Sequence, residues 1–340
     1  MYTGFYKLEG LPFQLSPDPR FFFGSSGHQK AMAYLTYGLH QGEGFIIVTG
    51  DIGAGKTTLV GHLFSNLDST KFIAAKLVTT QLEADDMLRM VAAAFGIPQE
   101  GADKSQLLRR IESFLIATHN AGKRSLLVID EVQNLSVRAL EELRMLSNFQ
   151  LGGKALLQSF LLGQPQFRAT LAKDDLEQLR QRVIASYHLG PLDLPETKAY
   201  IEHRLQLVGW TDDPEFTEAA YAQIHEHTGG VPRRINALCS RVLLNGFLEE
   251  LHVIDDLVVA KVGKELDDEI AQVMTFPDGE MVEANGHSNG NGHANGHGNG
   301  LNGDAAALAA RVGVLEQHVR THERTIKRAL EIAAEYLGKP

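Results

Sequence analysis

The stretch "FIIVTGDIGAGKTTL", residues 45 to 59, joins an apolar run to a glycine-rich loop and then to a helical pattern. Its segment "GDIGAGKT", residues 50 to 57, has the spacing GxxxxGKT, in which glycines let the backbone curl so that successive N–H groups face phosphate oxygens. A strand before the loop and a helix after it is the context that this chemistry needs. The sequence therefore predicts an α/β fold with a phosphate-binding loop.

Residues of this loop are expected to contact the phosphates of a nucleoside triphosphate and its magnesium ion. Lys56 is expected to reach the β and γ phosphates, and the Thr57 hydroxyl is expected to ligate Mg²⁺. The residues predicted to bind the nucleotide here are Gly50, Asp51, Ile52, Gly53, Ala54, Gly55, Lys56, Thr57 and Thr58.

A second motif, "SLLVIDE" at 125 to 131, is an apolar run that ends in two carboxylates. Asp130 at the strand end is predicted to hold the magnesium ion, directly or through water, and Glu131 to polarise the water that attacks the γ-phosphate. A helix N-cap is the alternative for an acid in this place. A carboxylate base differs from the glutamine of small switch GTPases, so the pattern favours Mg²⁺-dependent hydrolysis of ATP over GTP.

The order of apolar runs predicts the architecture. From 45 to about 190, β-rich runs that are apolar throughout alternate with helical patterns, which indicates a parallel sheet with helices on both faces. After "LGPLDLPE" the pattern is helical only, with Pro195, Pro214 and Pro232 expected in or near first turns. The predicted domains are an aromatic and proline-rich extension packed on the core (1–40), an α/β nucleotide-binding domain (41–192), a helical lid (193–270), a flexible Asn/Gly/His linker (271–304) and an amphipathic or coiled-coil helix (305–340).

The C-terminal part has its own composition. The segment "EANGHSNGNGHANGHGNGLNGD", 283 to 304, offers almost no apolar surface to offset the entropy of ordering. A heptad pattern follows over 305 to 337, with Val312, Val319 and Ile326 in one register. This pattern predicts self-association or docking on a partner, and a lone amphipathic helix is the alternative.

The net charge, the cysteine content and the apolar runs of the sequence limit the functions that the protein is expected to have. A formal net charge of −10 argues against wholesale coating of DNA or of an anionic membrane. Cys239 is the single cysteine and lies in the apolar run "INALCSRVLL", which indicates a buried side chain. Because no apolar run approaches bilayer length and the first residues lack a signal-peptide pattern, the chain is expected in the cytoplasm, or peripheral at the inner membrane through a partner.

Two arginine clusters are candidates to stabilise the charge that develops on the γ-phosphate. In "LEQLRQRV", Arg182 is the first choice and Arg180 the second for an arginine supplied to a neighbouring chain, the alternative being a solvated helix end or local ion pairs. In "HTGGVPRRIN", Arg233 lies at the first turn of a lid helix and is predicted to contact the nucleotide of its own chain. Arg234 is expected to face another surface.

These motifs together resemble an AAA+ ATPase, with "LLQSFLLGQ" placing the polar Gln164 after a strand. More narrowly, "LPFQLSPDPRFFFG" and "LLGQPQF" resemble the general secretion pathway protein A ATPases, especially the subfamily associated with exosortase/PEP-CTERM and exopolysaccharide loci. The resemblance covers about residues 1 to 270. It implies a sensor-1 role for Gln164, an arginine-finger role for Arg182 in a homo-oligomer and a sensor-2 role for Arg233. It also implies that Pro12 or Phe13 contacts adenine, with packing alone as the alternative.

Full-length secretion ATPases of this type carry a transmembrane helix and a peptidoglycan-binding domain after the ATPase. Neither is recognised in this sequence, so the linker and the C-terminal helix are expected to couple the protein to its partner. The favoured function is an assembly or secretion ATPase on the cytoplasmic side of an envelope system.

A DNA-binding regulatory ATPase of the transposition type is the alternative, and a nucleotide sensor without hydrolysis is a third class. Phosphate contacts for the DNA-binding alternative are assigned to Arg234, Arg241, Lys261, Arg320, Arg324, Lys327 and Arg328. No helix-turn-helix is evident after the lid.

Overall fold

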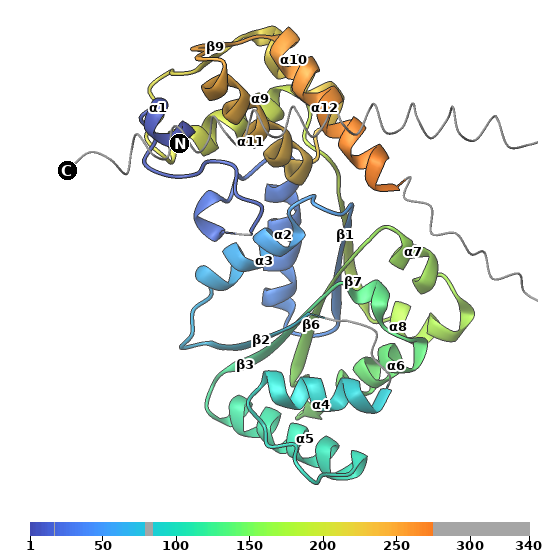
Figure 1. Ribbon diagram of the computed structural model, residues 1–340. Helices are drawn as coiled ribbons and strands as arrows, with labels where there is room; N and C mark the ends of the chain where they lie inside the picture. The colour runs from blue at the N-terminus through green and yellow to red at the C-terminus, as the bar shows by residue number, and fades with distance from the viewer. Residues whose placement is uncertain (17, 79–83, 275–340) are drawn as a thin grey trace, which may run out of the picture. The chain divides into compact units, whose positions relative to one another are not determined.

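Five apolar runs form the central sheet. They are β1 (Phe45–Gly50), β2 (Phe72–Val78), β3 (Arg124–Asp130), β6 (Leu157–Gly163) and β7 (Val183–Leu189). In the computed structural model, which describes residues 1–16, 18–78 and 84–274, these strands lie in the order β2-β3-β6-β1-β7 with every neighbouring pair parallel (Figure 1). The predicted parallel sheet is confirmed.

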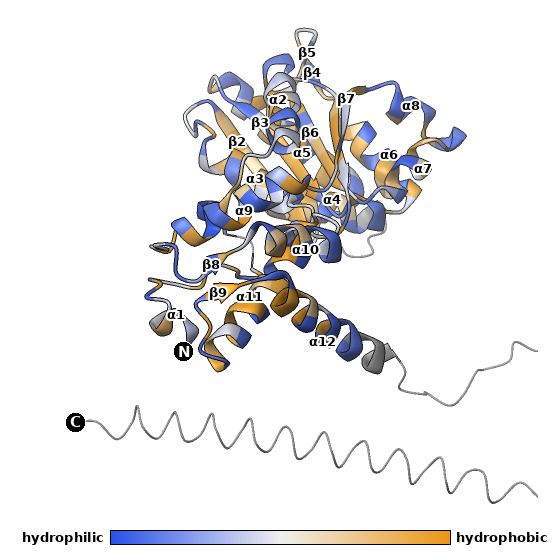
Figure 2. Cartoon of the chain, turned by 90° about the horizontal axis from the view of Figure 1, so that it is seen from above, coloured by the Kyte–Doolittle hydropathy of each residue, from blue (hydrophilic) through white to orange (hydrophobic). Residues whose placement is uncertain are grey.

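Helices cover both faces of this sheet. One face carries α2 (Ser26–Gln41) and α3 (Lys56–Ser65), and the other carries α4 (Ala84–Ala94), α5 (Lys104–Asn120), α6 (Val137–Leu146), α7 (Gln166–Leu171) and α8 (Glu177–Arg180). Figure 2 shows the apolar strands between helices that present polar residues outward.

Successive residues of β1 alternate between these two layers, as the period of a strand requires. In β1, Phe45 and Ile47 join the apolar cluster of α4, α5 and α6, whereas Ile46 and Val48 join the cluster of α2 and α3. Each such side chain, fully buried, contributes about 1.5–3 kcal/mol relative to exposure. Apolar residues on both sides of a strand are therefore the physical basis of the three-layer arrangement.

Shorter elements fill the connections. They are the 3-10 turns η1 (Pro19–Phe21), η2 (Val132–Asn134) and η3 (Asp174–Leu176) and a hairpin of β4 (Gln150–Leu151) and β5 (Lys154–Ala155). Gly152 and Gly153 both have positive φ, 59° and 77°, as a two-residue hairpin turn demands. The hairpin joins α6 to β6, and the sequence analysis did not predict it.

Within the described residues, which end at 274, the region after the sheet has four helices and a pair of short strands. Its elements are α9 (Leu194–Gln206), β8 (Glu215–Phe216), α10 (Glu218–Thr228), α11 (Pro232–Leu248), β9 (Val253–Ile254) and α12 (Asp256–Met274). We call this region the lid. The prediction of helices alone was wrong at β8 and β9, since two-residue strands leave no periodic signal.

The three prolines of the lid fall in different settings. Pro195 and Pro232 lie in the first turns of α9 and α11, where a missing N–H leaves no hydrogen bond unmade. Pro214 precedes β8 instead, and α10 begins at Glu218 behind the N-cap Thr217. Pro214 was expected in or near the first turn of this helix, and it lies before β8 instead, because the Thr217 hydroxyl caps the helix three residues later.

The N-terminal extension packs on two different parts of the molecule. Tyr6, Phe13 and Phe21 share one apolar cluster with α1 (Tyr2–Phe5) and the lid helices, and the Tyr6 hydroxyl donates to the Leu251 carbonyl at 2.9 Å. Helix α2 and Phe22 pack instead with the sheet and α3. The expectation that the whole extension rests on the α/β core is thus corrected for its first part, whose large aromatic side chains complete the apolar face of the lid.

Cys239 is fully buried in α11, as predicted, and burial raises the pKa of its thiol. Helix α12 runs to Met274, beyond the predicted end of the lid at 270. The predicted linker segment 283–304 and the C-terminal helix lie outside the described residues. Within the part of the chain that the structure describes, no helix combines the length and apolarity needed to span a bilayer.

Candidate nucleotide-binding site

The phosphate-binding loop, residues 50–57, connects β1 to α3 at the carboxyl edge of the sheet. Gly53 and Gly55 have φ values of 86° and 95°, a left-handed conformation that strains other residues. Helix α3 begins at Lys56 directly behind the loop. Its free N–H groups and the positive end of its dipole therefore point toward the loop, as anion binding requires.

Lys56 is buried inside this loop, with 5% of its surface exposed. Its ammonium donates to the carbonyl oxygens of Gly50 at 2.6 Å and Asp51 at 2.9 Å. Burial lowers the pKa of Lys56, while the nearby carboxylates of Glu131, Asp130 and Asp51 act in the opposite direction. The loop thus presents a fixed, desolvated positive charge.

The two predicted magnesium ligands meet at the end of β3. The Thr57 hydroxyl donates to Asp130 Oδ2 at 2.8 Å, and only 2% of Asp130 is exposed. A hydroxyl and a carboxylate are the hard oxygen donors that Mg²⁺ prefers. Lys76 on β2, which the sequence analysis did not single out, lies with its ammonium 3.2 Å from the same carboxylate oxygen.

Glu131 follows with a positive φ of 55° and lines the cavity above the loop. Gln133 Nε2 donates to Glu131 Oε2 at 2.6 Å, and Gln164 Nε2 lies 3.3 Å from the same oxygen. The backbone N–H of Gln164 in turn donates to Gln133 Oε1 at 2.9 Å. Gln133, which no motif indicated, therefore links the predicted base to the predicted sensor.

A cavity of about 290 Å³ opens above the phosphate-binding loop, close to the volume range of small-molecule sites. Its floor includes Gly53, Lys56, Thr57, Thr58 and Glu131. The N-terminal extension and the lid supply its other walls. The residues predicted for nucleotide binding and for the base thus lie at one cavity, with Gly50, Asp51 and Ala54 in the backbone of the loop beneath it and Ile52 at its rim.

Arg233 joins the cavity from the first turn of α11. Its backbone N–H donates to the Gly53 carbonyl at 3.2 Å, and a Cβ added at Gly53 would lie 2.5 Å from the Cβ of Arg233. The exposed Arg233 side chain lines the cavity, whereas the exposed Arg234 is not among its lining residues. The two neighbouring arginines therefore face different surroundings, as the sequence analysis expected.

The lid also contributes a buried network that the sequence analysis missed. Arg204 on α9 is 6% exposed and donates to the Pro12 carbonyl at 2.6 Å and to the Tyr200 hydroxyl at 2.9 Å. Its guanidinium lies 4.6 Å from the centre of the Phe21 ring, and Tyr200 donates to Asn236 Oδ1 at 2.8 Å. These polar groups form the wall of the cavity opposite the loop.

Pro12 and Phe13, one of which was expected at adenine unless they only pack, are not among the residues that line the cavity. Phe13 is 3% exposed and packs in the lid cluster, so the packing alternative describes it. The next residues, Gln14, Leu15 and Ser16, line the cavity instead.

His28 supports the loop from behind. It is 5% exposed, its Nδ1 lies 2.7 Å from Ser25 Oγ, and it forms a hydrogen bond to the backbone of Ala54. A Cβ at Gly55 would lie 2.7 Å from His28 Nε2, which shows how closely the ring approaches the loop. Burial lowers the pKa of His28, and the neutral form is favoured.

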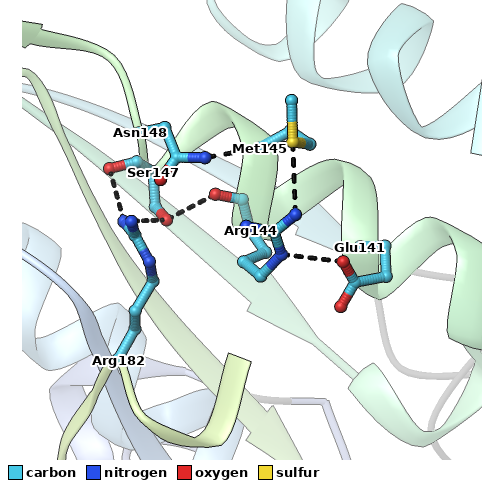
Figure 3. Close-up of polar contacts among 6 residues, drawn as sticks. All are labelled: Glu141, Arg144, Met145, Ser147, Asn148 and Arg182. Atoms are coloured by element: carbon cyan, nitrogen blue, oxygen red, sulfur yellow. Dashed lines mark hydrogen bonds and ion pairs between the residues drawn. The ribbon is translucent and has the colours of Figure 1, made fainter. Parts of the chain in front are cut away.

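Arg182 lies at the opposite edge of the sheet from the phosphate-binding loop. It directly precedes β7, and its carbonyl accepts from the N–H of Phe45 at the start of β1. Its Nη1 donates to the carbonyl and to the hydroxyl of Ser147 at 3.1 and 3.0 Å (Figure 3). Arg180 Nη1 donates to the Leu171 carbonyl at 2.8 Å. Neither arginine is brought to the nucleotide cavity of its own chain.

Comparison with known proteins agrees with this geometry. Residues 39–171 match a family described as the AAA domain. The chain therefore contains an AAA domain. The chain is 39% identical over 255 residues to general secretion pathway protein A of Aeromonas hydrophila, covering 75% of this chain and 46% of that protein. The chain spans about half the length of the curated relatives it matches.

Solved structures show the same fold at low identity. The Aeropyrum pernix ORC2 protein, determined as ADPNP-ADP complexes, matches with a TM-score of 0.53 and 16% identity over 70% of this chain and 66% of that one. The Aeropyrum pernix ORC1 protein in complex with DNA matches with a TM-score of 0.56 and 14% identity over 78% and 72%. At this identity the similarity concerns the AAA+ fold alone.

Proposed function

We propose that this AAA+ protein binds ATP together with Mg²⁺ and hydrolyses the γ-phosphate. The observation that carries the proposal is the convergence of Lys56, the Thr57–Asp130 hydrogen bond and Glu131 beside one cavity. A buried ammonium, a pair of hard oxygen donors and an adjacent carboxylate are the three elements that phosphoryl transfer to water needs. The nucleotide complexes of a protein with the same fold support ATP as the ligand.

Thr57 and Asp130 would hold the magnesium ion, which would neutralise charge on the phosphates. Within the described residues, no cluster of three or more His, Cys, Asp or Glu side chains forms a metal site, so the ion would depend on phosphate oxygens for other ligands. This fits Mg²⁺, which is usually bound through one or two carboxylates together with substrate phosphates.

The catalytic roles follow from position. Glu131 accepts the proton of the attacking water, while Gln133 and Gln164 hold its Oε2 oxygen in a fixed direction. Lys56 contacts the β and γ phosphates from within the loop, with the rest of the loop and Thr58 enclosing them. Arg233 contacts the nucleotide from the lid, so that the angle of the lid depends on what the cavity holds.

We assign Arg182 to the nucleotide of a neighbouring copy. Its distance from its own loop is set by the sheet, since it precedes β7 at the amino edge whereas the loop follows β1 at the carboxyl edge. A homo-oligomer with head-to-tail contacts is therefore part of the proposal.

The first experiment tests whether the phosphate-binding loop binds ATP. Lys56→Ala should lower ATP affinity at least about tenfold and remove turnover, because the buried charge on the phosphates is lost. Lys71→Ala removes an exposed lysine paired with Asp68 and serves as the matched control. Titration with fluorescent ATP and GTP analogues measures both variants. Normal ATP binding in Lys56→Ala, or a preference for GTP, would contradict the proposal.

We further propose that the protein is an assembly or secretion ATPase on the cytoplasmic side of an envelope system, peripheral at the inner membrane through a partner. The support is its 39% identity to general secretion pathway protein A. Within this group we place it in the subfamily of exosortase/PEP-CTERM and exopolysaccharide loci, on the N-terminal block "LPFQLSPDPRFFFG". The C-terminal segment 305–340 would be the element that binds the partner.

Co-purification tests this biological role. The Glu131→Gln chain, which should retain ATP, is isolated from its native cells with and without residues 283–340. We expect an envelope-associated protein to accompany only the longer chain. Recovery of the same partner with both chains would contradict the role of the C-terminal segment.

DNA binding is the second candidate, and the fold relative solved with DNA motivates its test. Two of the described basic residues considered for it are already paired: Arg241 with Glu269 at 2.6 Å and Lys261 with Glu249 at 2.5 Å. Paired cations have less charge available for phosphates, so we expect little duplex binding at low salt. If the protein bound duplex DNA with an affinity that falls steeply with salt concentration, the DNA-binding function would be favoured over the envelope function.

A further inference from the structure

The imidazole of His28, in the first turn of α2, lies against the phosphate-binding loop and uses both of its ring nitrogens. The side chain is buried, and Nδ1 lies 2.7 Å from the hydroxyl oxygen of the buried Ser25. That oxygen already accepts from the backbone N–H of His28 at 3.2 Å, so the hydroxyl hydrogen is directed to Nδ1. We therefore assign the hydrogen of the neutral ring to Nε2.

Nε2 is the ring atom that faces the loop. A Cβ added at Gly55 would lie 2.7 Å from Nε2 and 3.5 Å from the neighbouring ring carbon Cε1. Burial lowers the pKa of His28, and the hydrogen bond to the Ala54 backbone opposes this shift. A hydrogen bond that favours the protonated ring is one that the ring donates, so the Ala54 carbonyl accepts from Nε2.

This hydrogen bond fixes the orientation of the peptide between Ala54 and Gly55. In a planar trans peptide, the C=O group and the N–H group that follows it point in opposite directions. Because His28 holds the Ala54 carbonyl, the N–H of Gly55 points away from the imidazole. Gly55 has a φ of 95° and no side chain to restrict rotation of this peptide. His28 therefore supplies a restriction that the loop itself lacks.

The same turn of α2 is tied to the lid by Glu196. The backbone N–H of Ser26, the first residue of α2, donates to Glu196 Oε1 at 2.7 Å. Glu196 lies in the first turn of α9, where its side chain also closes a capping box with Asp193. One carboxylate thus faces the positive ends of two helices, which favours its anionic form and joins the helices to each other.

The loop is therefore connected to the lid by two separate routes. One is the hydrogen bond from the backbone N–H of Arg233 to the Gly53 carbonyl. The other runs from Ala54 through His28 and the first turn of α2 to Glu196, and it does not involve Arg233.

We propose that His28 is a positioning residue that aims the N–H of Gly55 at the phosphates of the nucleotide, and that Glu196 couples this alignment to the position of the lid. The role rests on the proposed nucleotide binding and extends it to residues outside both nucleotide motifs. A shift of α9 would move Glu196, the first turn of α2 and hence the imidazole that holds the loop. Because both residues act through the backbone that holds the phosphates, their substitution should change the affinity for ATP more than kcat.

Two substitutions of His28 separate hydrogen bonding from packing. His28→Leu fills much of the ring volume without a donor and should weaken ATP binding about tenfold, the effect of one lost hydrogen bond to a buried carbonyl. His28→Gln keeps an amide donor for that carbonyl and should bind ATP within about threefold of the wild type. His40→Leu, which changes an exposed histidine on the same helix, is the matched control. Calorimetric titration with ATP gives the affinities, and urea unfolding verifies that each variant is folded.

Either of two results with these variants would overturn the role of His28. Wild-type affinity in His28→Leu would show that the volume of the ring supports the loop and that the hydrogen bond is dispensable. Equal weakening in the folded Leu and Gln variants would show that the donor does not matter.

A double-mutant cycle tests the link to the lid. Glu196→Ala alone should weaken ATP binding about fivefold, through loss of its contact with Ser26. If His28 and Glu196 act through one set of contacts, the variant that combines His28→Leu with Glu196→Ala should lose about tenfold, whereas independent effects would multiply to about fiftyfold. Glu226→Ala, an exposed change on α10, should leave the affinity unchanged alone and in combination. A multiplicative loss in the double variant would overturn the coupling.

Hydrogen exchange in the wild-type chain completes the test and depends neither on a variant nor on hydrolysis. The N–H groups in the first turn of a helix lack intrahelical partners, so their exchange depends on contacts such as that of Ser26 with Glu196. Binding of a non-hydrolysable ATP analogue should slow exchange in the loop and in the first turns of both α2 and α9. Protection of the loop alone would contradict the coupling and leave the proposed function intact, whereas a wild-type chain that bound no nucleotide would contradict both.

Discussion

At the residue scale, the carboxylate of Glu131 is held by two amides, and the stronger hydrogen bond comes from Gln133 at 2.6 Å. Glutamine is neutral, so this contact fixes the direction of the carboxylate without supplying a charge. A non-glycine residue at a positive φ costs about 1–3 kcal/mol, and the surrounding contacts must over-determine it. Gln133 makes the shorter of these two hydrogen bonds and contributes to holding Glu131 in this conformation.

We predict that Gln133→Ala lowers kcat about tenfold, since a hydrogen bond to a charged group contributes about 1.5–3 kcal/mol and Gln164 retains part of the orientation. The affinity for ATP should remain as in the wild type. Steady-state kinetics together with equilibrium binding of ATP separate the two quantities. Gln166→Ala, an exposed glutamine on α7, is the control. A loss of affinity with unchanged kcat would show that Gln133 acts on the nucleotide instead.

His28 gives a pH dependence of stability. Burial lowers its pKa in the folded protein, although the hydrogen bond to Ala54 and the charge of Glu196 oppose the shift. The depressed pKa means that the unfolded chain binds the proton more readily. Neutral His28 therefore contributes fully to the free energy of unfolding above 6.5, the pKa of histidine in the unfolded chain. This contribution is lost as the pH falls through the lower pKa of His28 in the folded protein.

We expect the free energy of unfolding of the wild type to decrease between about pH 7 and about pH 5.5 more than that of His28→Gln, which cannot take up this proton. Urea unfolding at both pH values measures the difference. An equal decrease in the two proteins would show that other groups cause the acid sensitivity.

The sequence predicted the site residues that belong to a short motif. Lys56, Thr57 and Asp130 were assigned from spacing and strand ends, because parallel strands bring their carboxyl ends to one edge. The sequence did not predict roles for Gln133, Lys76 and Arg204, because these side chains meet their partners only through tertiary contacts. The buried pair of Arg204 and Tyr200 joins helix α9 to the carbonyl of Pro12, which no pattern within either segment encodes.

At the scale of elements, the phosphate-binding loop and the first turn of α11 are in direct contact. The φ of Gly53 is 86°, and an added Cβ would lie 2.5 Å from that of Arg233. Because real Cβ atoms do not approach so closely, Gly53→Ala must either distort the loop or displace the first turn of α11. Both changes disturb the cavity between them.

We predict that Gly53→Ala weakens ATP binding by about tenfold or more, through strain at the left-handed backbone and loss of the contact with α11. Calorimetric titration with ATP gives the affinity. Gly190→Ala is a fair control, since Gly190 has no left-handed φ and no neighbour within 4 Å of an added Cβ. Equal affinities in the two variants would exclude this loop–lid contact from nucleotide binding.

The elements that the sequence predicted well are the long ones. The five strands have six or seven residues each, and in β1 and β6 every residue is buried, which makes such apolar runs recognisable. The hairpin of β4 and β5 and the pair β8 and β9 have two residues per strand, too few for any period. For Phe13 the sequence left two alternatives open, because an exposed aromatic at a ligand and a buried one in a neighbouring cluster look alike in sequence.

At the scale of the whole molecule, the two edges of the sheet carry different groups. The carboxyl edge carries the loop, the Thr57–Asp130 pair and Glu131, and the amino edge carries Arg182. The proposed head-to-tail homo-oligomer would use both edges, so that each nucleotide would receive groups from two chains. ATP hydrolysis at the carboxyl edge is the central claim on which the other proposals depend.

Turnover and retention of ATP by Glu131→Gln test that claim most directly. The amide keeps the shape of the side chain but cannot accept the proton, so turnover should fall by at least about a hundredfold while bound ATP persists on the protein. Glu112→Gln, an exposed change on α5, should behave as the wild type. Quantifying ATP and ADP on each purified chain after incubation with Mg²⁺ and ATP gives the answer. Retained ATP with little ADP is the predicted result, and ADP formation equal to that of the wild type would contradict the account.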